Sequence, residues 1–340
     1  MDKLEIKRPA DYYCGNGIAF EVVAPFIVRK SGENTPKVLI CSDREVSGYY
    51  YNRFEEQFLK LGIKPVLVSV DARTKNKGLV SADQLFKSLV DFDFRSEDWL
   101  IALGGGGVID ICGFVAAVFK GGINLLAVPT TLNSMIESVL SSKAYLNSSG
   151  HKNEISVEIT PSVSILDPLF LNTVPPKVRS NGYASVIRLA LLYDLDLLTG
   201  IEGKKDFRVF VNDLYKARVA IEDKDPLLLT LGDELALSIE NYFRFMNYSE
   251  GEALALSLLA SVKESKREPL KKIYAALGLP VKLEGCTEKM IIKTLNDQFE
   301  HKGAVKIKMV DLDGGKWNIF EYDIEEAMNV LQSRLKRIIE

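Results

Sequence analysis

The chain has 340 residues, of which 47% are hydrophobic and 26% are charged, and this composition is typical of a folded globular protein with room for two domains. The net charge of -3 and the scattered Lys and Arg residues argue against a nucleic-acid-binding surface. The four cysteines lie too far apart in the sequence to indicate a disulfide framework or a thiolate zinc site. The first residues, MDKLEIKRPADYY, are too polar for a signal peptide, and no segment has the roughly 20 apolar residues that cross a bilayer. We therefore expect a cytoplasmic protein that binds neither nucleic acid nor membrane.

The first half of the chain alternates expected strands and helices. Residues 1–36 predict one or two opening strands, and the chain then has the strand and helix rhythm of a parallel sheet with right-handed crossovers. The expected strands are 37–41, 65–70, 99–103, 124–128 and 163–167, and the expected helices are 49–61, 81–89 and one that begins after the glycines 104–107. Ligands of such a sheet bind at the carboxyl ends of its strands.

Residues 99–114, WLIALGGGGVIDICGF, carry the clearest signal in this half. An apolar run meets four consecutive glycines, and a second apolar run then begins that carries Asp110. This pattern predicts a buried strand, a tight turn and the start of a helix. Glycines let backbone N–H groups approach an anion, and the helix N-terminus adds a favourable dipole, so a diphosphate would suit this turn. The spacing differs from G-x-G-x-x-G, and a tight turn without a ligand is the alternative interpretation.

The second half of the chain is predicted to be mainly helical. Pro168, Pro175 and Pro176 mark a domain boundary, and helical spacing follows from residue 181 onward. The expected helices are 183–198, 207–222, 227–245, 251–265, 268–277, 288–298 and 324–339, with a hairpin-like element over 305–310 and 316–320. The expected fold is an α/β domain over residues 1–172 and a mainly helical domain over residues 173–340.

Taken together, these residues resemble the dehydroquinate synthase family, the sugar phosphate cyclases. The stretch GGGGVIDICGFVAA is similar to the family pattern GGG-x-x-x-D-x-x-GF-x-A, and VPTTL, Lys143, Asn147, Lys152-Asn153 and DPLFLNTVP follow in the family's order and spacing. The iron-dependent alcohol dehydrogenases and glycerol dehydrogenases share the glycine turn, but the segment from PTTL to KN is closer to the cyclases. The resemblance implies an N-terminal dinucleotide-binding domain for NAD, a C-terminal domain with metal and substrate groups, and a homodimer.

By this resemblance, ten positions of the chain correspond to NAD contacts. They are Asp43, Lys75, Gly105, Gly106, Asp110, Thr130, Thr131, Glu137, Lys152 and Thr173. Glycine amides and paired threonines suit a pyrophosphate, and an acid suits the ribose hydroxyls. For the threonines the alternative is a helix cap, and for Asp43 and Lys75 it is a solvated loop residue.

The positions of the family's metal ligands have changed in this chain. Family members hold a divalent metal, usually zinc, with one glutamate and two histidines, and the corresponding residues here are Ser185, Asp233 and Glu250. The chain's two histidines, His151 and His301, fall on none of these positions. We therefore expect no zinc site of the usual kind. Asp233 and Glu250 are either ligands of a harder ion such as Mg²⁺ or Mn²⁺, or solvated or ion-paired acids.

Three cationic side chains form the expected catalytic set: Lys143, Lys302 and Arg188, which replaces a lysine of the family. They suit the phosphate or carboxylate of a phosphorylated small-molecule substrate, although Arg188 cannot readily shuttle a proton because its pKa stays above roughly 12. The leading hypothesis is a divergent cyclase that uses NAD and eliminates phosphate. A nucleotide-binding protein without catalysis and an NAD-dependent polyol dehydrogenase are the alternatives.

Overall fold

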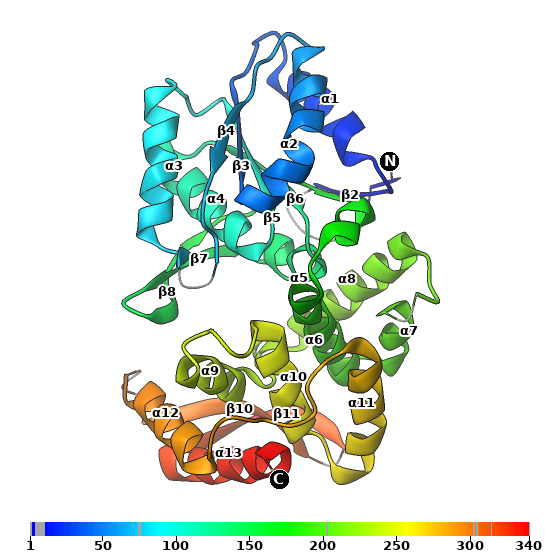
Figure 1. Cartoon of the computed structure of the whole chain (residues 1–340), viewed down its shortest axis with the longest axis vertical. Coiled ribbons are helices and arrows are strands. Elements are labelled where there is room, and N and C mark those ends of the chain that lie inside the picture. Colours follow the sequence, from blue (N-terminus) through cyan, green and yellow to red (C-terminus); the bar gives the residue numbers. More distant parts are fainter. Residues whose placement is uncertain are drawn as a thin grey trace. The chain divides into compact units, whose positions relative to one another are not determined.

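The computed structural model describes residues 2–3, 11–73, 76–201, 203–301, 303, 305–313 and 315–339 (Figure 1). The chain divides into two compact units, Met1–Val174 and Pro175–Glu340. This division lies close to the domain boundary that we expected between residues 172 and 173.

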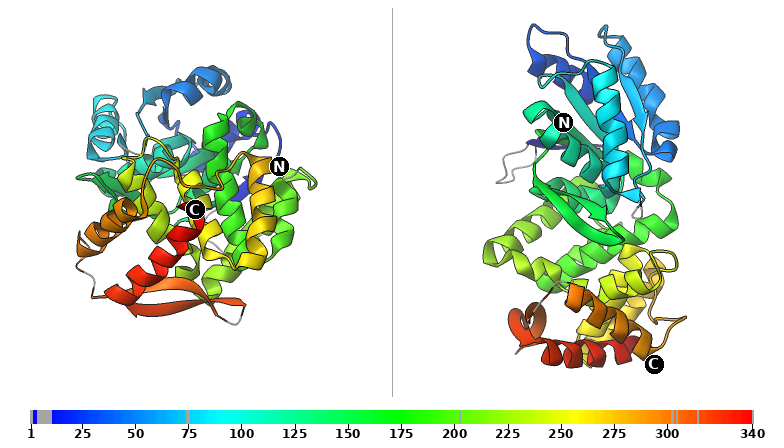
Figure 2. Two further views of the ribbon diagram at one scale, coloured as in Figure 1. Left: turned by 60° about the horizontal axis from the view of Figure 1, so that its bottom comes forward. Right: turned by 90° about the vertical axis from the view of Figure 1, so that its left-hand side faces the viewer.

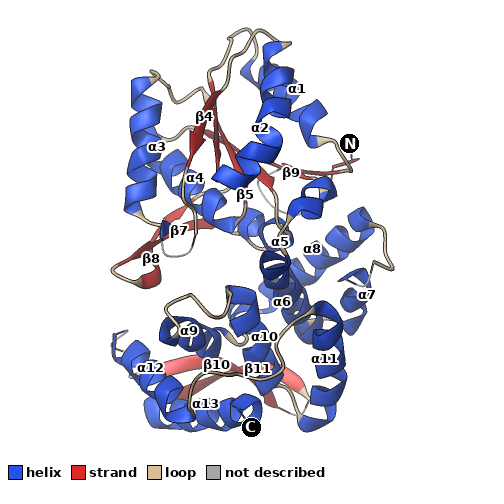
Figure 3. Ribbon diagram, viewed as in Figure 1, coloured by secondary structure: helices blue, strands red, loops and turns tan. Residues whose placement is uncertain are grey.

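Over the described residues, the first unit is built on a seven-stranded sheet that is mostly parallel (Figure 3). The strands are β1 (Asp2–Lys3), β2 (Asp11–Cys14), β3 (Val38–Ser42), β4 (Val66–Ser69), β5 (Trp99–Gly104), β6 (Asn124–Pro129) and β9 (Val163–Leu166). Their order is β1-β2-β9-β6-β5-β3-β4, and each neighbouring pair is parallel except β1 with β2. Strands β3 and β5 are buried along their whole length, as expected of central strands covered on both faces. The predicted parallel sheet is confirmed.

Helices cover both faces of this sheet. They are α1 (Ala19–Ser31), α2 (Arg44–Leu59), α3 (Leu79–Asp91), α4 (Gly106–Val118) and the short α5 (Leu132–Ile136). On one face, α1 and α2 pack against the strands through an aromatic core in which the Phe20 ring lies 4.9 Å from that of Phe54 and 5.7 Å from that of Phe170. On the other face, α4 places Cys112 against Cys41 of β3, and burial next to Cys41 raises the pKa of the Cys112 thiol.

The prediction of strands for residues 1–36 is wrong over α1. The buried residues of this helix fall at 19, 20, 23, 24, 26 and 27, which is the spacing of one helical face. Pro25 lies within this apolar run. It lies on the exposed side of the helix, where it does not disturb the packed face.

A hairpin that the sequence did not predict packs on α4. Its strands, β7 (Lys143–Ser148) and β8 (His151–Glu158), are antiparallel. Gly113 of α4 permits the contact, because a Cβ at Gly113 would lie 2.8 Å from the Cβ of Ala144. The hairpin therefore places Lys143 and Lys152 on an element of the first unit.

The second unit is mainly helical, as predicted. Its helices are α6 (Pro176–Leu192), α7 (Leu198–Ile201), α8 (Phe207–Lys224), α9 (Asp233–Tyr242), α10 (Glu250–Ser261), α11 (Glu264–Leu277), α12 (Glu288–His301) and α13 (Ile324–Ile339). Helix α10 is buried on almost every side and forms the centre of the unit. The hairpin β10 (Lys306–Asp313) and β11 (Lys316–Asp323) runs beside α13 (Figure 2).

The helix predicted over residues 227–245 is broken in the structure. A short 3₁₀ segment, Pro226–Thr230, precedes α9, and Gly232 between them has a φ of 90°. Ser257 of α10 donates a hydrogen bond of 2.7 Å to the Gly232 carbonyl, so the break is fixed by the central helix. A positive φ of this kind depends on tertiary contacts, and apolar spacing in the sequence does not reveal it.

In the part of the chain that is described, no helix has both the length and the apolar content that a membrane crossing requires.

Candidate functional site

The carboxyl ends of neighbouring parallel strands lie side by side in the first unit. Ser42 of β3 is paired with Leu103 of β5, and Gly104 of β5 is paired with Pro129 of β6. The chain leaves these three strands at consecutive positions of one sheet edge. The residues at these exits, all predicted from the sequence, are Asp43, Gly105 and Thr130.

The glycine turn has the geometry of an anion cradle. Gly105 is the N-cap of α4 and supplies no side-chain acceptor, so the N–H groups of Gly106 and Gly107 in the first helical turn have no acceptor within the helix. All three glycines are partly exposed. A Cβ at Gly105 would make only ordinary contact, 3.4 Å from Thr131, whereas a Cβ at Gly107 would lie 2.2 Å from the Ala72 carbonyl oxygen. Gly107 is therefore required by packing against the loop after β4, while Gly105 and Gly106 border the turn that an anion could reach.

Two buried hydroxyls at this sheet edge have no hydrogen-bond partner among the described residues. Ser42 and Thr130 are 0% and 3% exposed, and neither Ser42 Oγ nor Thr130 Oγ1 meets a partner. Thr130 is held by its backbone, whose N–H donates to the Gly104 carbonyl at 2.9 Å. Buried polar atoms are normally satisfied, so an unsatisfied pair at the end of two strands fits a polar ligand that completes the site. Thr131, in contrast, caps α5 in a reciprocal arrangement with Ser134, which was the alternative interpretation of its hydroxyl.

Asp110 lies in a network that joins three segments. Its Oδ2 accepts a hydrogen bond of 2.7 Å from Lys77 Nζ, and its Oδ1 accepts one of 3.2 Å from the backbone N–H of Tyr145 in β7. Lys77 Nζ also donates to Asn153 Oδ1 at 3.0 Å. The network fixes α4, the loop before α3 and the β7–β8 hairpin relative to one another. Lys77 was missed from the sequence because nothing in the turn DARTKNKG sets it apart from its neighbour Lys75.

The remaining predicted cofactor residues occupy various positions of the first unit. Asp43 caps α2 by accepting a hydrogen bond of 2.9 Å from the Val46 N–H. Thr173 Oγ1 donates to the Phe170 carbonyl at 3.1 Å and lies 2.7 Å from Tyr50 Oη. Glu137, at the end of α5, and Lys152, on β8, are half-buried.

The predicted lysines are distributed differently. Lys143 is exposed at the end of the β7–β8 hairpin opposite the turn beside which Lys152 lies, so the hairpin does not bring these two side chains together. Lys75 and Lys302 lie outside the described residues.

In the second unit, the predicted catalytic arginine and one predicted metal ligand form an ion pair. Arg188 of α6 is 8% exposed, and its Nη1 donates to Asp233 Oδ1, at the start of α9, over 2.7 Å. Asp233 is the more accessible partner, with 53% of its side chain exposed. The Arg188 guanidinium is thus paired with Asp233, one of the two carboxylates that we predicted as metal ligands.

The donor set of this unit does not fit the family's zinc ion. Ser185 is buried on α6, and Glu250 is exposed at the start of α10 beside Gly251, whose N–H donates to Asn181 Oδ1 at 2.8 Å. No group of three or more His, Cys, Asp or Glu side chains gathers for a metal in the described part of the chain. A serine, an exposed glutamate and an ion-paired aspartate lack the imidazoles that make a zinc site.

Sequence comparison places this chain beside the dehydroquinate synthases. The family model described as "3-dehydroquinate synthase N-terminal" matches residues 67–181. The 3-dehydroquinate synthase of Lactococcus lactis subsp. cremoris is 26% identical over 320 residues, which are 87% of this chain and 90% of that protein. The enzyme of Clostridium kluyveri is 26% identical over 288 residues, 78% of this chain and 80% of its own length.

Structural comparison gives the same fold. A 2-epi-5-epi-valiolone synthase from Streptomyces hygroscopicus subsp. jinggangensis, solved with NAD⁺ and Zn²⁺ bound, superposes with a TM-score of 0.82 at 19% identity, covering 97% of this chain and 96% of that one. A 2-deoxy-scyllo-inosose synthase, solved with carbaglucose-6-phosphate, NAD⁺ and Co²⁺, gives 0.80 at 19% identity, covering 97% and 99%. The fold is that of the class formed by sugar phosphate cyclases and their dehydrogenase relatives. By sequence, the chain is similar to the dehydroquinate synthases, and the resemblance given above puts Ser185, Asp233 and Glu250 at the positions of their usual zinc ligands.

Proposed function

We propose that this chain is an NAD-binding enzyme of the sugar phosphate cyclase type that acts on a phosphorylated, sugar-derived acid or polyol without the family's histidine-bound zinc. The observation that carries the proposal is the edge formed by Gly105, Gly106 and Thr130. This edge combines the N–H groups at the start of α4, which have no acceptor within the helix, with the buried Thr130 hydroxyl, which has no hydrogen-bond partner among the described residues. These groups match the pyrophosphate of a dinucleotide, and both cyclases named above were solved with NAD⁺.

The chemistry assigned to each group follows from its type. NAD supplies reversible hydride acceptance when it is bound. The N–H groups of Gly106 and Gly107 would hold its pyrophosphate, and Thr130 Oγ1 would donate to a phosphate or ribose oxygen. By the resemblance to the cyclases, Lys143 and Lys302 are the cations that we assign to the substrate phosphate or carboxylate, and Lys302 is assigned from its sequence position alone. Arg188 would stabilise negative charge on a substrate oxygen, because its guanidinium remains protonated and cannot act as a base.

The activity is tested by incubating the purified chain with NAD and a panel of sugar phosphates that includes a heptulosonate phosphate. We expect release of inorganic phosphate without net accumulation of NADH, because a cyclase returns the hydride within each turnover. Net NADH accumulation would instead identify a polyol dehydrogenase. If the chain binds NAD but releases phosphate from none of these sugar phosphates, the cyclase assignment is rejected.

One observation favours a second candidate function, a nucleotide-binding protein without catalysis. The ion pair of Arg188 with Asp233 neutralises a position at which the family requires a metal ligand. Losing metal-ion stabilisation costs several kcal/mol of a reaction barrier unless another group replaces it. The Arg188→Lys variant distinguishes a catalytic function from nucleotide binding without catalysis. It changes turnover if Arg188 serves catalysis, whereas it leaves NAD binding unchanged in either case.

A further inference from the structure

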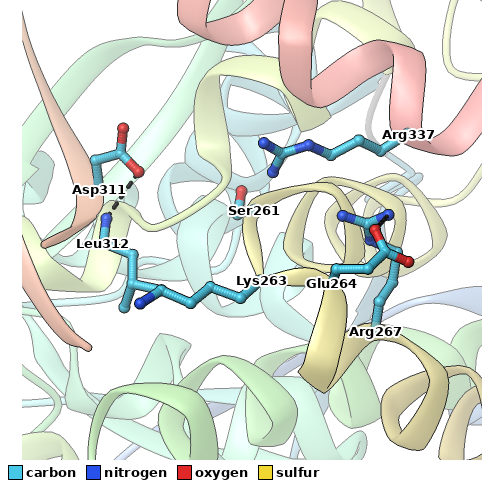
Figure 4. A pocket seen from close by; sticks show the side chains of 7 residues that line it. All are labelled: Ser261, Lys263, Glu264, Arg267, Asp311, Leu312 and Arg337. Carbon is cyan, nitrogen blue, oxygen red and sulfur yellow. Dashed lines mark hydrogen bonds and ion pairs between the residues drawn. The ribbon is translucent and has the colours of Figure 1, made fainter. Parts of the chain in front are cut away.

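A pocket of about 410 Å³ lies within the second unit at the start of α11 (Figure 4). Its walls come from the end of α10, the start of α11, strand β10 and the end of α13. The lining residues are Ser261, Lys263, Glu264, Arg267, Asp311, Leu312 and Arg337. None of the candidate site residues described above lines this pocket, so its chemistry needs a separate explanation.

Two arginines, Arg267 and Arg337, line this pocket, and a third, Arg334, lines the neighbouring pocket that shares Asp311 and Arg337 with it. Arg267 on α11 and Arg334 on α13 are 8% and 3% exposed, and Arg337 on α13 directs its guanidinium toward the middle of the pocket. Burial, followed by the charges of Arg267 and Arg334, lowers the pKa of Arg337. Like charges that share a confined space repel one another, and an anion between them would relieve this repulsion.

The carboxylates of the pocket do not balance these cations. Asp311 pairs with Arg334 at 2.8 Å, and Glu264 pairs with Arg267 through a side chain that is 78% exposed. Among the residues that line this pocket, three cationic side chains, Lys263, Arg267 and Arg337, therefore face two carboxylates. Among the described residues, Arg337 donates only to the Ala260 carbonyl, at 2.9 Å, although a guanidinium has five N–H donors.

Two further features favour an anion. In the described part of the chain, the buried Nε of Arg267 has no hydrogen-bond partner, which leaves a charged side chain of the pocket wall incompletely satisfied. Helix α11 spans 14 residues, and its N-cap, Lys263, provides no side-chain acceptor. The Lys266 N–H donates to the Lys263 carbonyl at 2.9 Å, whereas the N–H groups of Glu264 and Ser265 in the first turn have no acceptor within the helix, and Lys263 and Glu264 place this positive end of the helix dipole at the pocket wall.

We propose that this pocket binds a dianionic phosphate group, carried by inorganic phosphate or by a small phosphomonoester. Phosphate oxygens would accept from Arg337 and from the first-turn N–H groups of α11, and Lys263 would close the exposed side. Glu264, already largely exposed, would turn from Arg267 into solvent when the anion enters. The volume lies within the range of small-molecule sites and leaves room for the organic part of an ester. This site does not depend on the cyclase assignment.

The test is isothermal titration calorimetry of the full chain with inorganic phosphate and, separately, with glucose 6-phosphate at fixed ionic strength. We expect binding of both, and tighter binding of the ester identifies an organic phosphate as the ligand. Arg337→Gln should weaken phosphate binding about tenfold, the loss expected for a charge-assisted contact. Lys263→Gln, an exposed change that leaves the fold intact, should weaken it in the same direction.

Lys266→Gln is the matched control, because Lys266 is exposed on the same helix and does not line the pocket. Its phosphate affinity should equal that of the unmodified chain. The proposal is overturned if neither ligand binds, if Lys263→Gln binds phosphate as tightly as the unmodified chain, or if Lys266→Gln loses as much affinity as Lys263→Gln. Equal loss of affinity in Lys266→Gln and Lys263→Gln would show that phosphate responds to the net charge of the chain and not to a specific site.

Discussion

Arg188 and Asp233 form a 2.7 Å ion pair at two positions that the resemblance to the cyclases assigns to substrate and metal. The guanidinium is almost fully buried, whereas the carboxylate is half exposed. A buried charge is costly unless it is paired, so Asp233 has a structural role that does not require an ion.

Asp233→Asn should lower the free energy of unfolding by about 1 kcal/mol, because it leaves Arg188 less well compensated while solvent screens the exposed side of the pair. Urea unfolding measures the change. Asp196→Asn is the control, because it removes an exposed partner of Lys205 and should have little effect. A thermal shift on adding Zn²⁺, Mg²⁺ or Mn²⁺ that disappears in Asp233→Asn would show that Asp233 is a metal ligand instead.

Thr130→Val should weaken NAD binding without lowering the stability of the protein. The Thr130 hydroxyl is buried without a partner, so a methyl group in its place should leave the protein as stable or slightly more stable. NAD binding should weaken about fivefold, the loss of one hydrogen bond. Ser164→Ala is the matched control, because Ser164 Oγ is also buried without a partner but lies in β9, away from the strand ends. If both variants bind NAD equally well, Thr130 does not contact it.

Gly107→Ala should destabilise the first unit by about 1–3 kcal/mol, because the new Cβ meets the Ala72 carbonyl oxygen and the loop after β4 must move. The control is Gly48→Ala within α2, where the space around the glycine is open. There alanine should stabilise the helix by about 0.5–1 kcal/mol. Chemical denaturation compares the two, and equal stability of both variants would show that the loop packs less tightly against the turn than the structure indicates.

Acid should loosen the loop that packs on the glycine turn. Hydrogen bonds from Arg73 hold the pKa of Asp71 well below its usual range, and Asn76 also donates to this carboxylate. A depressed pKa gives stability that is fully present above the unfolded value, roughly 3.9, and is lost as the pH falls below it. Asp71→Asn should therefore be less stable than the unmodified chain at pH 7, and this difference should shrink toward pH 3. A constant difference over that range would contradict the assignment.

The sequence predicted the fold where the signal was local. The apolar strands beside the glycines and the apolar face of α13 were predicted correctly, because burial and spacing determine them. The break at Gly232 and the β7–β8 hairpin were not, since both depend on contacts with α10 and α4 that are distant in sequence. The same holds for the candidate site. Gly105 and Thr130 could be found from strand ends, whereas the contact of Lys77 with Asp110 exists only in three dimensions.

A titration of NAD into the purified full chain, before and after treatment with EDTA, tests most directly whether the first unit still binds a dinucleotide while the second has lost its zinc. We predict binding of one NAD per chain with an affinity that neither EDTA nor added Zn²⁺ changes. Absence of binding, or binding that vanishes with EDTA and returns with Zn²⁺, would contradict this central claim.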